Sequence, residues 1–200
     1  MNIYLLRHGE TDWNLEGRLQ GHQDIVMNAN GIAQIERIAS ALAKLNIDVD
    51  VIVSSPLKRA QRSAQMVADR LGYEKENIMT EPLFTERGFG EAEGLIYAEG
   101  KDQLFDGEFR NVESIETLCE RGGEAFRKTV LNYEGQNILI VAHGAILKAL
   151  IVSITDGIIS YESGKVTFHP GSIYLVKHEE NVVEIFRFEA DKKDFYKVNF

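Results

Sequence analysis

Two stretches of this chain carry a continuous apolar segment that ends at, or one residue before, a histidine followed by a glycine. Residues 137–144 read Asn-Ile-Leu-Ile-Val-Ala-His-Gly, and residues 3–9 read Ile-Tyr-Leu-Leu-Arg-His-Gly. Continuous apolar runs are typical of strands buried on both faces, as in a parallel sheet covered by helices. Ligands of such sheets bind beyond the carboxyl ends of the strands. The two runs therefore predict an α/β fold in which His8 and His143 meet at one edge of the sheet.

The residues around His8 are suited to binding phosphate. Arg7 carries a rigid fork of donors that matches phosphate oxygens, and Gly9 allows a tight turn and the close approach of a bulky anion. A neutral imidazole at this place can attack phosphorus as a nucleophile. Each histidine taken singly has a simpler explanation. His8 would be an exposed polar residue at a strand end, and His143 would cap the helix expected over 145–154.

A third segment adds a second arginine. Val51 to Val53 form a short apolar run, Ser55 is a good helix N-cap, and Pro56 suits the first helical position. Arg59 then falls in the first turn of this helix, whose positive end favours anions. The alternative for Arg59 is a solvated surface position, which is also what we expect of the arginines further along the helix.

A loop with glycines at positions 88, 90 and 94 contributes a carboxylate. Glu86 is the candidate of this loop for acid–base chemistry, although surface carboxylates are common and the signal is weak by itself. The glycine spacing does not match a dinucleotide-binding fingerprint.

Together these segments resemble the histidine phosphatase superfamily, in the branch typified by cofactor-dependent phosphoglycerate mutase. Order and spacing agree from residue 2 to about residue 155. The matching text is Arg7-His8-Gly9-Glu10-Thr11-x-Trp13-Asn14, Gly17-Arg18-Leu19-Gln20-Gly21, Ser54-Ser55-Pro56-Leu57-x-Arg59-Ala60, Leu83-x-x-Glu86, Phe89-Gly90-x-x-Glu93-Gly94 and Val141-x-His143-Gly144. The resemblance implies a three-layer α/β sandwich with a mainly parallel central sheet and helices on both faces.

The resemblance also implies a role for each matched residue. His8 corresponds to the nucleophile that becomes phosphohistidine, and Glu86 to the proton donor for the leaving oxygen. The cradle around the phosphoryl group corresponds to Arg7, Arg59 and His143, and the substrate-binding positions to Asn14, Gln20, Gly21 and Gly144. A transferring phosphoryl group mainly needs positioning and positive charge, which this set supplies without a metal. We therefore expect no metal and no cofactor.

The stretch over 95–115 distinguishes hydrolysis from mutase chemistry. Phosphoglycerate mutases of this branch carry a long insertion with paired arginines here, whereas this chain has Lys101, Arg110 and five acidic residues, with no adjacent arginines. A Gly-Gly-Glu-Ser element of the family is replaced by Asn-Val-Glu113-Ser114, which puts its role in doubt. We expect a phosphatase that hydrolyses small phosphorylated metabolites. Mutase-type phosphoryl transfer and a non-catalytic phosphate-binding relative remain the alternatives.

Composition agrees with a cytoplasmic enzyme that forms one domain over residues 1–200, with a short lid-like insertion at about 91–115. The net charge of −9 argues against a nucleic-acid partner, and no apolar run is long enough to span a membrane. The start of the chain lacks the pattern of a signal peptide, and the single cysteine, Cys119, excludes an internal disulfide. The partner expected is a small phosphate monoester, and the chain is expected to be a monomer or a homodimer.

The remaining pattern predicts the scaffold. A helix capped by Asn28 or Asn30 is expected to reach about Leu45, with Ile32, Ile35, Ala39 and Leu42 facing inward. A second helix is expected over 113–133, where Gly122-Gly123 could break it. The runs 172–176 and 182–188 predict a C-terminal antiparallel hairpin with a Glu-Glu-Asn turn. Three histidines without matched partners are expected at the surface or in turns: His22, His169 and His178.

Overall fold

The computed structural model describes residues 1–179, 182–190 and 192–200. Within these residues, the strands are β1 (Asn2–Arg7), β2 (Val51–Ser54), β3 (Met79–Thr80), β4 (Ile138–Ala142), β5 (Ile173–Glu179), β6 (Val182–Glu189) and β7 (Asp194–Lys197). They form one sheet in the order β3-β2-β4-β1-β5-β6-β7. The first four strands in this order pair in parallel, and the last three are antiparallel to their neighbours.

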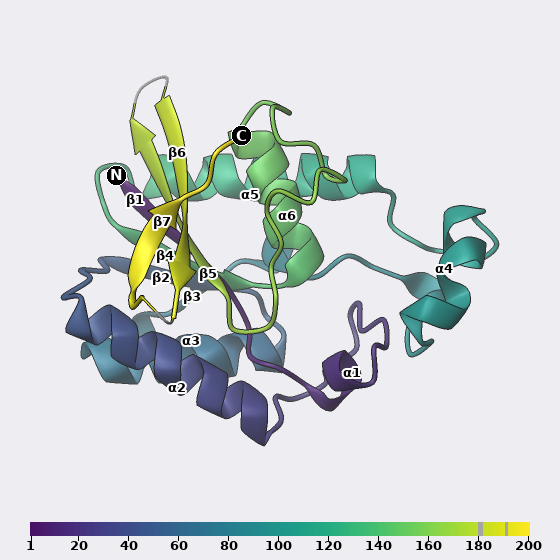
Figure 1. The fold of residues 1–200 in the computed structure, drawn as a ribbon, viewed down its shortest axis with the longest axis horizontal. Helices are drawn as coiled ribbons and strands as arrows, with labels where there is room; N and C mark the ends of the chain where they lie inside the picture. The colour runs from purple at the N-terminus through teal and green to yellow at the C-terminus, as the bar shows by residue number, and fades with distance from the viewer. Residues whose placement is uncertain (180–181, 191) are drawn as a thin grey trace.

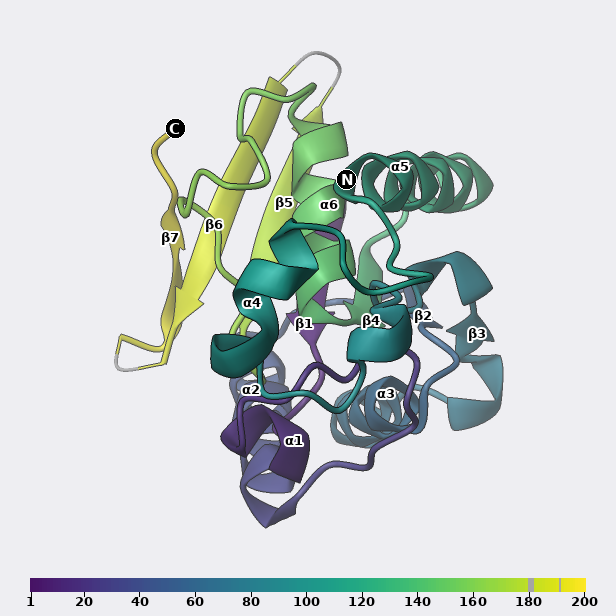
Figure 2. The same cartoon turned by 90° about the vertical axis from the view of Figure 1, so that its right-hand side faces the viewer.

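Helices cover both faces of the sheet. The α-helices of the described residues are α1 (Asp12–Leu15), α2 (Ala29–Lys44), α3 (Lys58–Leu71), α4 (Tyr97–Phe105), α5 (Ile115–Asn132) and α6 (Gly144–Ile154). Helices α2 and α3 lie together on one face, and α5 and α6 lie on the other (Figures 1 and 2). The predicted three-layer α/β sandwich with a mainly parallel centre is confirmed.

The apolar run of β1 explains why two layers of helices are needed. Side chains alternate along a strand, so neighbouring residues face opposite sides of the sheet. Ile3 and Leu5 join the core beneath α5 and α6, whereas Tyr4 and Leu6 join the core beneath α2 and α3. Every residue from Ile3 to Leu6 is at most 4% exposed. A strand apolar on both faces is stable only between two such layers.

The parallel register places the two His-Gly sequences side by side. In the pairing of β1 with β4, Arg7 lies opposite Ala142, so His8 and His143 leave the sheet at the same edge. The backbone N–H of His8 donates to the carbonyl of Ala142, at 3.0 Å, and continues the ladder by one step. Helices α1 and α4 lie near this end of the sheet, at the right of Figure 1. The predicted meeting of the two histidines is thus a consequence of strand register.

Several local predictions need correction. Helix α3 begins at Lys58 after an N-cap at Leu57, so Ser55 is not its N-cap and Pro56 precedes it. Of the two caps predicted for α2, Asn28 is the one observed, and Ile32 is 37% exposed and does not face the core.

The glycine pair of α5 does not break that helix. Gly122 and Gly123 are buried against α6, where a Cβ on Gly123 would lie 2.5 Å from the Ser153 Oγ. These glycines let the two helices approach closely.

The C-terminal strands extend beyond the predicted hairpin. Strands β5 and β6 pair antiparallel as expected, and β7 adds a third strand that the sequence pattern did not indicate. The predicted turn falls largely on residues 180–181, outside the described residues. The side chain of His178 also lies outside what the structure describes. His22 and His169 are exposed as expected.

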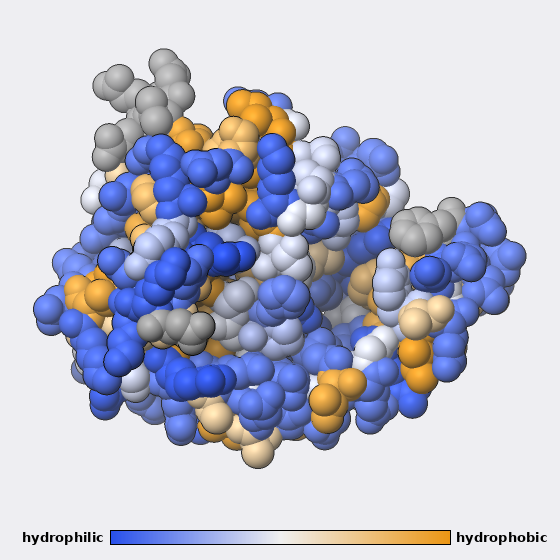
Figure 3. Space-filling view, in the orientation of Figure 1, coloured by the Kyte–Doolittle hydropathy of each residue, from blue (hydrophilic) through white to orange (hydrophobic). Residues whose placement is uncertain are grey.

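In the part of the chain that the structure describes, none of the helices is both long and apolar enough to cross a membrane. The face shown in Figure 3 is mainly hydrophilic, and α4, within the predicted insertion, stands out from the body at its right-hand end.

Candidate active site

His8 is held in one tautomer by its own backbone. The ring Nδ1 lies 2.7 Å from the carbonyl oxygen of Gly9. Because a carbonyl only accepts, Nδ1 carries the proton and donates, which leaves Nε2 unprotonated when the ring is neutral. Burial lowers the pKa of His8 well below its usual value, and the nearby charges of Arg7 and Arg59 lower it further. The ring is therefore neutral at physiological pH, with a lone pair available on Nε2.

His143 lies against His8, with the ring centroids 5.1 Å apart. Its Nδ1 accepts from the Nε of Arg59 at 3.2 Å, so its Nε2 carries the proton and donates to the Ser55 Oγ at 2.7 Å. Burial lowers the pKa of His143 well below its usual value, followed by the charge of Arg59. Both ring nitrogens are engaged by the protein in this structure. His143 therefore orients Arg59 directly. Its Nε2 can donate a hydrogen bond to a ligand only after its bond to Ser55 opens.

Two buried arginines flank the histidines. Arg59 donates from Nη1 to the Gln23 carbonyl at 2.6 Å and from Nη2 to the Gly21 carbonyl at 2.9 Å. Burial lowers the pKa of Arg59 to about 10, which still leaves it charged at neutral pH. Arg7 donates from Nη1 to the Phe168 carbonyl at 2.6 Å, and its buried Nε has no partner among the described residues. A buried donor without a partner is costly and marks a place where a ligand oxygen fits.

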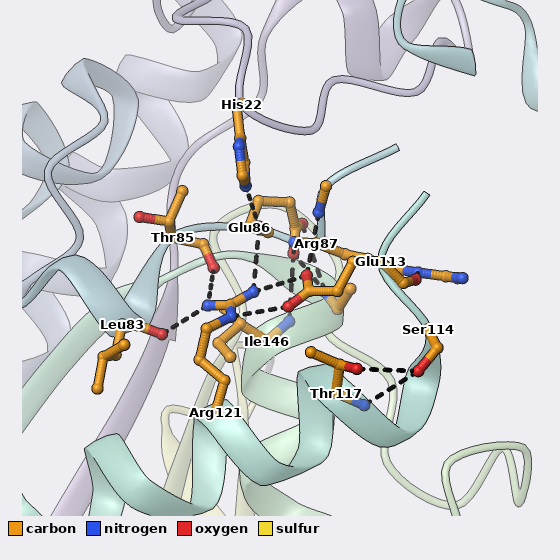
Figure 4. A network of polar contacts seen from close by, with 12 residues as sticks. His22, Leu83, Thr85, Glu86, Arg87, Glu113, Ser114, Thr117, Arg121 and Ile146 are labelled. Atoms are coloured by element: carbon orange, nitrogen blue, oxygen red, sulfur yellow. Dashed lines mark hydrogen bonds and ion pairs between the residues drawn. The ribbon is translucent and has the colours of Figure 1, made fainter. Parts of the chain in front are cut away.

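Glu86 belongs to the loop that follows Phe84, and its carboxyl group lies at the start of α6, close to these cations. Its Oε1 accepts from the backbone N–H groups of Arg87, Ala145 and Ile146, at 3.0, 3.1 and 3.2 Å. Its Oε2 has a single, longer contact of 3.4 Å with the Ala145 N–H. The side chain is 8% exposed, which fits a carboxylate anchored through one oxygen at a helix N-terminus (Figure 4). The other oxygen is the more available for proton transfer.

These groups border a pocket of about 300 Å³. Of the predicted site residues, those that line it are Arg7, His8, Asn14, Gln20, Gly21, Arg59, Glu86 and Gly144. His143 is fully buried behind them. The Oε1 of Gln20 is a second buried polar atom with no partner among the described residues. Gly144 lets Arg7 lie close to the backbone, because a Cβ at this position would be 3.2 Å from the Arg7 guanidinium.

Positively charged side chains predominate among the charged residues that line the pocket. Besides the arginines already described, Arg18 and Lys148 line it, and Glu86 is its one carboxylate among the described residues. Nowhere in the described part of the chain do three or more His, Cys, Asp or Glu side chains gather as a metal site would need. The arrangement is suited to a multiply charged anion brought against the Nε2 of His8.

The comparison with known families now identifies the chain's relatives. The sequence profile described as "Histidine phosphatase superfamily (branch 1)" matches residues 3–191. The chain belongs to this superfamily. Within it, the chain is 37% identical over 155 residues to the "Uncharacterized phosphatase PhoE" of Bacillus subtilis, covering 78% of each protein.

Two further proteins similar to this chain carry different names. The chain is 30% identical over 203 residues to "Phosphoglycerate mutase-like protein 4" of Arabidopsis thaliana, covering 95% of this chain and 81% of the relative. A phosphoserine phosphatase variant from Entamoeba histolytica, solved in complex with phosphoserine, superposes with a TM-score of 0.77 at 26% identity. That match covers 91% of this chain and 94% of the other. The superfamily predicted from the sequence is confirmed.

Sequence reasoning missed several residues of the site. Ser55, expected to cap a helix, hydrogen-bonds to His143 instead. His22, expected to be an ordinary surface residue, contacts the Glu86 carbonyl through Nε2 at 3.0 Å. Lys148 and Tyr161 also line the pocket, with the lysine Nζ 4.6 Å from the centre of the tyrosine ring. The spacing of Lys148 from Gly144, one helical turn, is the signal that could have found the lysine.

Proposed function

We propose that this member of the superfamily is a phosphatase that hydrolyses small phosphate monoesters through a phosphohistidine at His8. The observation that carries the proposal is the fixed tautomer of His8. The Gly9 carbonyl holds the ring proton on Nδ1, and burial among cations keeps the ring neutral, so Nε2 is a nucleophile at the floor of a cationic pocket.

The proposed first step transfers the phosphoryl group to His8. The Nε2 lone pair forms a bond to phosphorus while the bond from phosphorus to the ester oxygen breaks. Arg7 and Arg59 stabilise the charge spread over the non-bridging oxygens, with the unpartnered Nε of Arg7 as one donor. Glu86 gives its proton to the leaving oxygen, and its Oε2 is the oxygen with the weaker existing contact. The alcohol then departs.

The proposed second step returns the enzyme to its starting state. Ionised Glu86 takes a proton from a water molecule that attacks phosphorus, and the bond between phosphorus and Nε2 breaks. Phosphate is released, and Glu86 again carries a proton. In this scheme Asn14, Gln20 and Gly21 help hold the substrate, and the backbone at Gly144 lets Arg7 lie close. His143 acts mainly by orienting Arg59.

The scheme needs no metal, because the arginines supply the positive charge that a metal would otherwise provide. We also propose that residues 1–200 act as one domain, with 91–115 as a lid-like insertion. The single sheet that connects β1 to β7 supports this division. The net charge of −9 supports a small-molecule partner over nucleic acid.

Hydrolysis is favoured over mutase transfer by the state of the insertion. Its Arg110 pairs with Glu91 at the surface, where the arginine side chain is 82% exposed, and Lys101 is also exposed. Neither of these cations lines the pocket of the described residues. A second phosphate or carboxylate therefore finds no paired arginines in the insertion.

A substrate panel combined with a trapping experiment tests the proposal. Phosphate monoesters should be hydrolysed with and without added bisphosphoglycerate, and rapid quenching with p-nitrophenyl phosphate should trap acid-labile phosphate on His8. His8→Ala should abolish both the trapped phosphate and turnover. Activity of His8→Ala near that of the wild type would refute the mechanism. Phosphate transfer to an acceptor alcohol that depends on bisphosphoglycerate would favour the mutase alternative.

A further inference from the structure

Arg121 of α5 and Glu113, just before that helix, form an ion pair behind the candidate active site. The Nε and Nη2 of Arg121 each lie 2.8 Å from a different carboxylate oxygen of Glu113 (Figure 4). The two side chains are 18% and 15% exposed, so the pair is largely shielded from water. Bidentate pairs of this kind fix geometry as well as charge. Glu113 belongs to the element whose departure from the Gly-Gly-Glu-Ser text left its role open.

The remaining donors of Arg121 reach the backbone that leads to Glu86. Nη1 donates to the carbonyls of Leu83 and Thr85, at 2.6 and 2.9 Å, and Nη2 donates to the carbonyl of Glu86 itself at 3.3 Å. A guanidinium has five N–H donors, and all of those on Arg121 are used by these contacts and the two to Glu113. Arg121 therefore holds three carbonyl groups of the 83–86 segment from one point.

Glu113 holds the chain on the other side of Glu86. Its Oε2 accepts from the Gly88 N–H at 3.1 Å, and its own backbone N–H donates to the Gly88 carbonyl at 2.8 Å. Its carbonyl accepts from the Nε of Arg87 at 2.8 Å. Burial acts to raise the pKa of Glu113, but the Arg121 and Gly88 hydrogen bonds outweigh it and hold the pKa below its usual value. Glu113 therefore stays ionised throughout the neutral range.

We propose that Arg121 and Glu113 are positioning residues that set the place of the Glu86 carboxyl in the pocket. The proposal rests on the proposed function, in which Glu86 protonates the leaving oxygen. In the described part of the chain, neither residue of the pair lines the pocket, so both act through Glu86. A displacement of a reacting group by about 1 Å costs roughly 10²-fold in rate, which is the scale at which such positioning is felt.

Leaving-group dependence tests the proposal. An alkyl phosphate needs a proton on its leaving oxygen, whereas p-nitrophenyl phosphate hardly does. Arg121→Met should slow the first step on glycerol phosphate about 10- to 100-fold and the first step on p-nitrophenyl phosphate much less. Arg127→Met, on the same helix and exposed, is the matched control and should keep the wild-type ratio of the two rates. Equal slowing on both substrates would indicate a merely structural role and overturn the proposal.

Two further variants keep the test decisive. Arg121→Lys retains the charge but not the fork of donors, so it should show the same selectivity in weaker form if Arg121→Met does not fold. The selectivity is the slowing of the first step on glycerol phosphate divided by its slowing on p-nitrophenyl phosphate. In the double variant Arg121→Met/Glu86→Gln, this ratio should not exceed that of Glu86→Gln alone, because both changes act on one group. Additive selectivity would overturn the proposal. If Glu86→Gln slows both substrates equally, the acid role fails. If Glu86→Gln slows the alkyl phosphate selectively but Arg121→Met (or Arg121→Lys, where Arg121→Met does not fold) does not, only the positioning proposal fails.

Discussion

Replacing Glu86 with glutamine removes a proton donor while keeping nearly all of its surroundings. The three short backbone contacts to this side chain, from 3.0 to 3.2 Å, all end on Oε1. The amide oxygen of glutamine can take the same place and accept the same hydrogen bonds. The amide nitrogen then replaces Oε2, whose only contact is the longer one to Ala145. Glu86→Gln therefore leaves the anchor in place and deletes the acid.

The size of the effect follows from what the proton does. General acid catalysis typically contributes about 10²–10⁴-fold, so the first step on an alkyl phosphate should slow by roughly 10²-fold or more. A factor of 10² corresponds to about 2.7 kcal/mol of transition-state stabilisation. Nitrophenolate leaves without much help, so the same step on p-nitrophenyl phosphate should change much less.

Rapid-quench measurement of the first turnover is the appropriate assay, because slower water attack on phosphohistidine would mask the first step in steady state. Equal slowing of both substrates would refute the acid role and indicate that Glu86 serves in binding. Glu10 and Glu91 would then be the next candidates for the acid. Glu10 bonds to Asn28 and Asn30 at the start of α2, and Glu91 pairs with Arg110, so both are occupied away from the phosphate cradle.

The remaining predictions concern pH, metal and specificity. Because burial depresses the pKa of His8 and of His143, the unfolded chain takes up protons first as the pH falls below about 6.5. The stability that these two buried histidines contribute is therefore fully present above that pH and is lost as the pH falls below it. Chemical denaturation should show that the free energy of unfolding decreases by up to about 1.4 kcal/mol per histidine at about pH 5.5. A free energy of unfolding that does not change with pH in this range would contradict the burial argument. Exhaustive chelation should leave turnover intact, and activity restored by added magnesium or zinc would overturn metal independence. Lys148→Met should raise KM about 10-fold for phosphate esters with a second anionic group, with little change for p-nitrophenyl phosphate; equal changes in KM would exclude a specific contact.

Much of the site could be predicted because strand ends carry it. An apolar run that ends in His-Gly needs only parallel pairing to bring His8 beside His143, and the register of β1 with β4 does so. Arg59 follows a third strand of the same sheet, β2, in the first turn of α3. Local sequence is informative at these places because strand, turn and helix start lie within a few residues of each other.

Other contacts depend on segments far apart in the chain. Ser55 has the local pattern of a helix cap, yet its hydroxyl meets His143, 88 residues later. Arg121 on an amphipathic helix looks like any partly exposed arginine, and its contacts with the 83–86 segment exist only because α5 packs beside that loop. Glycine propensity likewise suggested a break in α5, but tertiary packing against α6 overrides it.

The sequence by itself determined the layers of the fold and the chemical groups at the carboxyl ends of its strands, because apolar periodicity and strand-end motifs are local properties. The tertiary structure alone decided which nitrogen of His8 is free, which oxygen of Glu86 is anchored, and what holds the acid in place. Those features depend on hydrogen bonds, and a hydrogen bond forms only where two atoms are placed to within a few tenths of an ångström, which no sequence pattern specifies.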